Sequence, residues 1–268
     1  MNLSKFIDGI LLPRAEIALD VQDAKGRIDL VLSLSSLIKN NLGLETVFAL
    51  LKRLTFNNLA FTFADIPGTD LTSIGITFDE ILVKRTKEQF ISLQNGYIIV
   101  ELNLNEASGG EIKDIINGIT IRSLVVKVSD ALLNEAVRQN RDMLLKKNIS
   151  DLSISFLDGI SAVKGKFHKI TAINFSVNVS AQIKNKKLLI ELSNMNVMNF
   201  GVPSLIKNKI IDFASYFAKL DFVTVEDNCI LVDPYKIAGQ KIDFDLKSID
   251  FEKDFLVVEL FKEEGGGE

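Results

Sequence analysis

The feature that most constrains this chain is a strict alternation of apolar and polar residues over residues 173–184. Every second side chain is apolar: Ile173, Phe175, Val177, Val179, Ala181 and Ile183. A period of two is typical of a β-strand with one buried face, and twelve residues at the rise of a strand span roughly 40 Å. The pattern resumes at 188–192 after the polar segment 185–187. The sequence therefore predicts a long hairpin, with strands well above the usual five or six residues.

The same alternation recurs in four other stretches of the chain. Apolar residues occupy every second position in 28–34, 59–63, 98–104 and 152–156. One-sided alternation is typical of antiparallel sheets that have one solvated face, whereas strands of a parallel sheet are apolar on both faces. We therefore expect most of the chain to form antiparallel sheet.

Three stretches instead show apolar residues at helical spacing. The first covers 129–147, with Ser129 as the expected N-cap and Asp130 in the first turn, where it suits the helix dipole. The second is 202–220, in which Pro203 suits the first turn. The third is 35–53, with a break favoured at Gly43. The patterns predict amphipathic helices of up to about 18 residues, near 27 Å in length.

Helices and strands of matching length indicate the fold class. A long antiparallel sheet with one apolar face must curl or pack on another element. We expect an α+β fold in which a long, strongly curved antiparallel sheet wraps around long amphipathic helices. An elongated apolar groove between helix and sheet would accept an acyl chain. A filled core would give the same sequence pattern, so both alternatives stay open.

The order of these patterns suggests two parts. Residues 31–42 and 125–136 both read as strand, serine and amphipathic helix, which is either an internal repeat or a common junction. We place a boundary near residue 118, after the Gly109-Gly110 turn. Residues 1–118 then form a β-rich part with one helix, and residues 119–268 form the helix-plus-curved-sheet unit. The two parts can share one core.

Composition removes several classes of chemistry. One His and one Cys cannot build a multi-histidine metal site or an internal disulfide. A net charge of -4 without a clustered basic surface argues against nucleic acid as a partner. No phosphate-loop, nucleophile-elbow, zinc-protease or dinucleotide motif is present. We therefore predict no enzyme activity, no catalytic residues, no cofactor and no metal.

Location and membrane contact have weaker signals. No stretch reaches 18 uninterrupted apolar residues, and the first 13 residues read as a short amphipathic helix or arm rather than a secretory signal. We expect a cytoplasmic protein, or an exported one if a signal has been removed. The basic segment of Lys184, Lys186 and Lys187 is either a solvated turn or a peripheral contact with an anionic membrane.

Residues 119–260 resemble the tubular lipid-binding (TULIP) superfamily, which includes bactericidal permeability-increasing proteins and small bacterial relatives. The likeness lies in the order of VVKVSDALLNEAV, long Ser/Asn-alternating strands, MNFGVPSLIKNKIIDFASYF, NCILVDPYKI and FLVVEL. The resemblance implies a curved sheet around a long helix, with a lengthwise seam that holds a lipid tail. Members of the family are carriers or sensors without catalytic residues. The secreted animal members carry a disulfide, which a single Cys excludes here.

By position, the resemblance assigns ten residues to the seam: Leu132, Leu133, Ala136, Val137, Phe175, Val177, Ile206, Ile210, Phe213 and Phe217. The expected function is non-catalytic binding of a lipid or other long apolar ligand, with lipid transfer as an extension. The alternative is a protein-interaction or assembly module with a filled core and no ligand. The expected partners are a lipid or fatty-acyl ligand and, for the alternative, another protein or a second copy of the chain.

Overall fold

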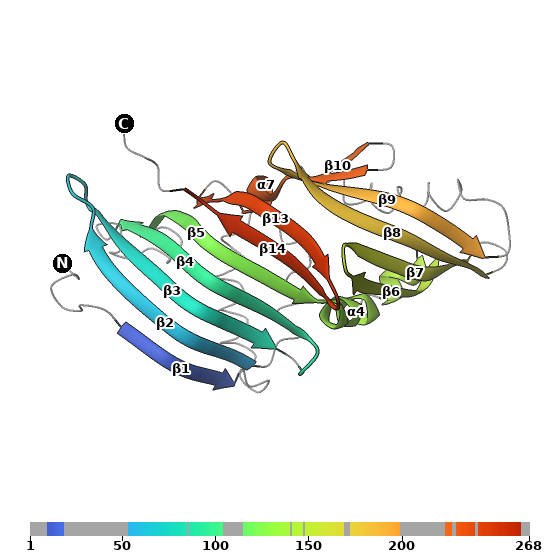
Figure 1. Ribbon diagram of the computed structural model, residues 1–268, viewed down its shortest axis with the longest axis horizontal. Helices are drawn as coiled ribbons and strands as arrows, with labels where there is room; N and C mark the ends of the chain where they lie inside the picture. The colour runs from blue at the N-terminus through green and yellow to red at the C-terminus, as the bar shows by residue number, and fades with distance from the viewer. Residues whose placement is uncertain are drawn as a thin grey trace. The chain divides into compact units, whose positions relative to one another are not determined.

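The structure is a computed structural model of the chain. It describes residues 10–18, 53–84, 86–103, 115–139, 141–146, 148–168, 172–198, 223–226, 229–238 and 241–263. These residues form two sheets of mostly antiparallel strands (Figure 1).

The first sheet has eight strands in the order β1-β2-β3-β4-β5-β14-β13, with β12 paired parallel to β5. Its strands are β1 (Ile10–Ala18), β2 (Arg53–Asp65), β3 (Leu71–Lys84), β4 (Phe90–Asn103), β5 (Ile116–Ser129), β12 (Ile242–Asp243), β13 (Asp245–Glu252) and β14 (Phe255–Phe261).

The second sheet has six strands in the order β10-β11-β9-β8-β7-β6. Its strands are β6 (Ile149–Leu157), β7 (Ile160–His168), β8 (Ala172–Lys184), β9 (Lys187–Met198), β10 (Val223–Glu226) and β11 (Cys229–Val232). The described helices are α4 (Asp130–Gln139), α5 (Arg141–Lys146) and α7 (Pro234–Ala238).

The expected α+β class with long amphipathic helices is wrong. In the described part of the chain the helices are only ten, six and five residues long, and strands dominate. The helix predicted over 129–147 is replaced by α4 and α5. Arg138 and Gln139 at the end of α4 are exposed, whereas Leu144 of α5 is buried, so the predicted apolar stripe is shared between two short helices. The helix predicted over 202–220 lies outside the described residues, as does nearly all of 35–53; Arg53 begins β2.

The predicted antiparallel strands and the long hairpin are confirmed. β8 and β9 pair from Lys184↔Lys187 back to Asn174↔Met198. They are joined by Asn185 and Lys186, whose φ angles of 53° and 61° are both positive. Two consecutive left-handed residues make a type I′ turn, which matches the twist of the strands it joins. The predicted stretches 59–63, 98–104 and 152–156 fall in β2, β4 and β6, except for residue 104, which is not described. The predicted strand over 28–34 lies outside the described residues.

The chain divides into two compact units. Unit 1 contains the chain up to Lys127 together with Tyr235–Lys247 and the segment from Val258 onwards. Unit 2 contains Val128–Pro234 and Ser248–Val257. The single boundary expected near residue 118 differs from this division, because two later segments belong to unit 1.

Four long strands change phase at a residue with a left-handed backbone. These residues are Asn58, Asn95, Asp151 and Asn194, with φ between 46° and 52°. Asn and Asp adopt this conformation more readily than other residues with side chains. On the two sides of such a residue, successive core-facing side chains are an odd number of positions apart instead of two. Ile149 and Leu152, which flank Asp151, belong to one apolar cluster. The strands therefore keep one apolar face while they bend.

Next to the bends, each sheet pairs a glycine with a phenylalanine on the neighbouring strand. Phe78 on β3 lies directly opposite Gly96 on β4, and Gly165 on β7 lies opposite Phe175 on β8. A Cβ atom at Gly96 would lie 2.0 Å from the Phe78 ring, and one at Gly165 would lie 2.7 Å from the Phe175 ring. Each ring therefore lies across a backbone that has to be free of a side chain.

Candidate functional site

The described residues of the predicted seam lie in unit 2, mostly in its core. Ser129 caps α4 as expected, because its Oγ accepts a hydrogen bond from Leu132 N at 3.3 Å. Leu132 is fully buried, and Val137 packs against the cluster that contains Phe175 and Val177. Leu133 and Ala136 are half-buried. The other four assigned residues, Ile206, Ile210, Phe213 and Phe217, lie outside the described residues.

The core of unit 2 is packed between helix and sheet. Leu144 of α5 joins Ile149, Phe167, Phe175 and Val177 in one buried cluster. The side chain of Asn134 fixes α4 to the edge of β6. Its amide nitrogen donates to Ile154 O at 2.7 Å, and its amide oxygen accepts from Ile154 N at 2.8 Å. In the part of unit 2 that the structure describes, the helices thus cover the apolar face of the sheet.

Unit 1 has a second apolar surface, built only from strands in its described part. Rows of directly opposed residues cross β3 and β4 on one face, and the rows through Ile76 and Ile74 continue onto β2 at Phe61 and Phe63. We call these residues the apolar face: Val83–Ile91, Ile81–Leu93, Phe78–Gly96, Phe61–Ile76–Ile98 and Phe63–Ile74–Val100. The rows run from Val83 to Ile74, a distance of about 30 Å at the rise of a strand.

Most of the apolar face is only half-buried. Leu59, Phe78 and Leu124 form its buried centre. Around them pack eight side chains that keep part of their surface exposed: Phe61, Ile76, Ile81, Leu93, Ile98, Ile121, Val126 and Leu260.

The opposite face of the same strands carries a polar network at the bend. The Glu80 carboxylate accepts hydrogen bonds from Ser92 Oγ at 2.7 Å, from Asn57 Nδ2 at 3.2 Å and from Gln94 Nε2 at 3.3 Å. Ser123 Oγ donates to Asn95 O at 2.8 Å, and Asn58 bonds to Asp79. These contacts tie β2 to β5 along the bend. Because its carboxylate already accepts three bonds, Glu80 has a structural role in the sheet.

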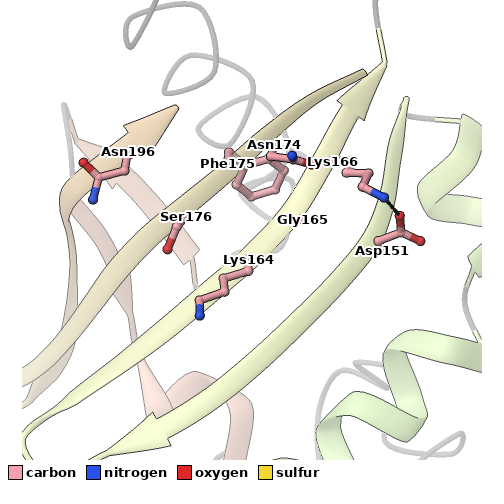
Figure 2. A pocket seen from close by; sticks show the side chains of 8 residues that line it. All are labelled: Asp151, Lys164, Gly165, Lys166, Asn174, Phe175, Ser176 and Asn196. Carbon is pink, nitrogen blue, oxygen red and sulfur yellow. Dashed lines mark ion pairs between the residues drawn. The ribbon is translucent and has the colours of Figure 1, made fainter. Parts of the chain in front are cut away.

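Unit 2 contains a groove of about 720 Å³ over β6 to β9, which we call the lysine groove. Figure 2 shows its eight lining residues: Asp151, Lys164, Gly165, Lys166, Asn174, Phe175, Ser176 and Asn196. The register accounts for this grouping. Lys164 lies opposite Ser176, which lies opposite Asn196, and Lys166 lies opposite Asn174. Directly opposed residues share one face of a sheet, so these five polar side chains line the same face.

A β-bulge fixes one wall of the lysine groove. Asp151 lies at an irregularity in the register between Ser150 and Ser153 of β6. Its carboxylate forms an ion pair with Lys166 Nζ at 2.7 Å. The hydrogen bond from Lys166 and the charge of that ammonium lower the pKa of Asp151, with smaller contributions from Arg141 and His168. Lys164 is exposed and has no ion pair with any residue that the structure describes.

A Ser–His contact lies beside this groove. Ser150 Oγ is 2.7 Å from His168 Nε2 at the exposed end of β7. A nucleophilic dyad also needs a group that orients the second imidazole nitrogen and donors for an oxyanion. Among the described contacts none supplies either, so the geometry here is that of a surface hydrogen bond.

Two further searches of the described residues gave negative results. No group of three His, Cys, Asp or Glu side chains in the described ranges could hold a metal ion. None of the helices in those ranges is long and apolar enough to cross a membrane. The three lysines of the β8–β9 turn are exposed, and their contact with a membrane stays a prediction.

Comparison with known proteins does not place the chain. No family model, no curated protein and no solved structure matches it. The resemblance to the tubular lipid-binding superfamily therefore stays untested.

Both surfaces found in the structure were only partly visible in the sequence. Asn174 and Ser176 were recognised as the polar side of β8, but nothing local showed that Lys164 and Asn196 lie beside them. The apolar face was seen in fragments, because the alternation changes phase at Asn58 and Asn95. A search for a phase change centred on Asn or Asp would have joined these fragments.

Proposed function

We propose that this protein binds a lipid, or another ligand with a long apolar chain, on the apolar face of unit 1, and that it does so without catalysis. The observation that carries the proposal is the half-exposed state of this face. Outside the buried centre, the Ile, Leu, Val and Phe side chains of its rows keep part of their surface exposed over about 30 Å. Large apolar patches that remain accessible to solvent mark interaction or ligand-binding sites.

The dimensions suit an acyl chain. A bilayer core about 30 Å thick holds two chains end to end, so one chain spans about 15 Å. The apolar face is therefore long enough for one chain and for two in line. Each methylene group removed from water contributes about 0.8 kcal/mol, so even partial cover of a chain favours binding.

The difference in polarity between the two faces indicates which part of a ligand the apolar face would bind. Two charged residues lie in the polar network along the bend. Asp79 accepts a hydrogen bond from Asn58, and Glu80 accepts hydrogen bonds from Asn57, Ser92 and Gln94. The rows of the apolar face contain no charged residue. A ligand held there would be recognised by its hydrocarbon part, and its polar end would have to project beyond the rows.

Native mass spectrometry of the gently purified chain, followed by titration with a dansyl-labelled fatty acid, tests the proposal. We expect a bound mass or saturable uptake. Ile76→Ser removes a half-buried part of the face and should weaken uptake about fivefold, equivalent to about 1 kcal/mol of lost apolar contact.

The matched control is Thr77→Ser, because Thr77 is the exposed neighbour of Ile76 on the same strand and points to the other face. It should leave uptake unchanged. A clean mass for the unliganded chain together with no uptake would contradict the proposal. If a second copy of the chain or a protein partner is found instead, the assembly-module alternative is favoured.

A further inference from the structure

The lysine groove of unit 2 has the chemistry of a ligand site that is independent of the apolar face. We propose that it binds a hydroxylated monocarboxylate, that is, a sugar acid of the uronate type. It lies on the polar face of the second sheet and shares no residue with the apolar face of unit 1. Either proposal can therefore fail while the other holds.

The charged side chains of the groove indicate the sign of the charge on the ligand. Two ammonium groups and one carboxylate line the groove. The carboxylate of Asp151 is occupied by Lys166 at 2.7 Å, which leaves Lys164 as the exposed positive charge. Neither Arg141 nor His168 belongs to the lining, so these three groups set the charge of the groove. A net charge of about +1 is matched by a monoanion, whereas a phosphate carries up to about two negative charges.

The remaining lining groups favour hydroxyl groups on the ligand. Ser176 and Asn196 continue the row that starts at Lys164, and Asn174 lies opposite Lys166. Neighbouring strands are about 4.8 Å apart, so the row offers a cation, a hydroxyl and an amide on the scale of a sugar ring. Hydroxyl and amide groups both donate and accept hydrogen bonds, as sugar hydroxyls do.

The lining also argues against other ligand classes. Here the lining side chains are polar apart from Phe175, which is 6% exposed and belongs to the core, and Gly165, which has none. Binding of single-stranded nucleic acid needs exposed aromatic rings on which bases stack. A buried ring cannot serve that purpose.

The β-bulges give the groove a fixed shape. Asp151 on β6 and Asn194 on β9 have left-handed backbones beside irregular registers, one on each flank of the groove. Bulges increase the local twist of a sheet and re-aim side chains. The bulge at Asp151 orients its carboxylate toward Lys166, so the positions of the two ammonium groups are fixed relative to each other.

Titration of the full chain by nuclear magnetic resonance or calorimetry tests the proposal, with D-glucuronate, acetate, glucose and inorganic phosphate as probes. We expect glucuronate to bind more tightly than each of the other three, and its affinity to fall as salt is added. An oligogalacturonide in a further arm shows whether the site takes a free sugar acid or a unit of a polymer.

Two variants locate the binding. Lys164→Gln should weaken glucuronate binding about fivefold, the loss expected for one exposed charge contact. Asn196→Asp keeps the shape of an exposed side chain but adds a negative charge, and should weaken binding at least as much. The control is Lys253→Gln, which makes the same charge change at an exposed turn outside the groove and should have no effect.

Three results would overturn the proposal. One is the absence of glucuronate and oligogalacturonide binding at millimolar concentration. Another is equal binding of glucose or acetate, which would mean that charge and hydroxyl groups are not read together. The last is an affinity that changes equally in Lys164→Gln and Lys253→Gln. Loss of fatty-acid uptake through Ile76→Ser has no bearing on these outcomes.

Discussion

The two sheets bend in the same way but exchange the residues that make the bend possible. In unit 1 the phenylalanine lies on β3 and its glycine on β4, and in unit 2 the glycine lies on β7 and its phenylalanine on β8. In both, strands in the same sheet carry a left-handed Asn or Asp. The requirement is thus a cross-strand pair of a ring and a bare backbone, and either strand can supply either partner.

The two pairs differ in what surrounds the ring. Phe175 packs with Leu144 of α5, and Val137 of α4 borders the same cluster. The described cluster around Phe78 consists of strand residues only, and most of them are half-exposed. The difference shows how similar sheets can support a filled core in one unit and a candidate binding face in the other.

The largest expected effect is on stability, and it tests the difference between the surroundings of the two rings. Phe175→Ala should destabilise the protein by about 4–5 kcal/mol, because helix and sheet side chains close around the ring and would leave a cavity. Phe78→Ala should cost less, about 3 kcal/mol, because its half-exposed surroundings can relax or admit water. Urea unfolding, followed separately by hydrogen exchange in each unit, measures both.

The exposed Phe261, on β14, is the control for this pair, and Phe261→Ala should change stability little. If Phe78→Ala proves as costly as Phe175→Ala, the apolar face of unit 1 is covered as completely as the core of unit 2. The proposal that it binds a ligand would then lose its support.

The second prediction concerns the glycines. A Cβ at Gly96 would lie 2.0–2.4 Å from three atoms of the Phe78 ring, so the whole buried ring has to move. We expect Gly96→Ala to cost about 2–3 kcal/mol. At Gly165 the shortest contact is 2.7 Å, to the tip of the Phe175 ring. Gly165→Ala should cost about 1 kcal/mol or less, because alanine also restores part of the stability that glycine loses in a strand.

A double-mutant cycle identifies the cause. In the Phe78→Leu background, the cost of Gly96→Ala should fall, since the smaller side chain no longer crosses the backbone of β4. An unchanged cost would mean that the glycine is needed for its backbone and not for the ring.

The sequence was most informative where the chain does not bend. The strand β8 has no left-handed residue, and its alternation over twelve residues was read directly, together with the hairpin to β9. On β6 and β9 the phase changes at Asp151 and Asn194, so a period-two search covers only one side of each bend. The helix predicted over 129–147 corresponds to α4 and α5, which are two short helices instead of one long one.

The candidate sites depend on pairing that no local pattern contains. Lys164 and Asn196 are 32 residues apart in the sequence and meet only because β7, β8 and β9 are in one particular register. The rows of the apolar face likewise follow from the pairing of β3 with β2 and β4. Period and composition predict which face of a strand is polar, whereas register decides which polar groups become neighbours.

The smallest expected effect separates charge from backbone at the bend of β6. In unit 2 the left-handed residue is Asp151, which is ion-paired with Lys166, and the corresponding residue of β2 in unit 1 is the uncharged Asn58. The lowered pKa of Asp151 means that the native state favours its ionised form. That contribution to stability is fully present above the ordinary carboxyl pKa, near 4, and is lost as the pH falls through the lower native value.

Asp151→Asn retains a residue that tolerates the left-handed backbone and removes the charge. Its urea midpoint should therefore lie below that of the wild type at about pH 6, and the difference should shrink at about pH 3 as the wild-type carboxylate is protonated. Lys166→Gln should behave in the same way and should raise the pKa of Asp151 in a carboxyl titration. A difference that is equal at both pH values would show that the ion pair contributes nothing in solution, and that β6 bends like β2, through its backbone alone.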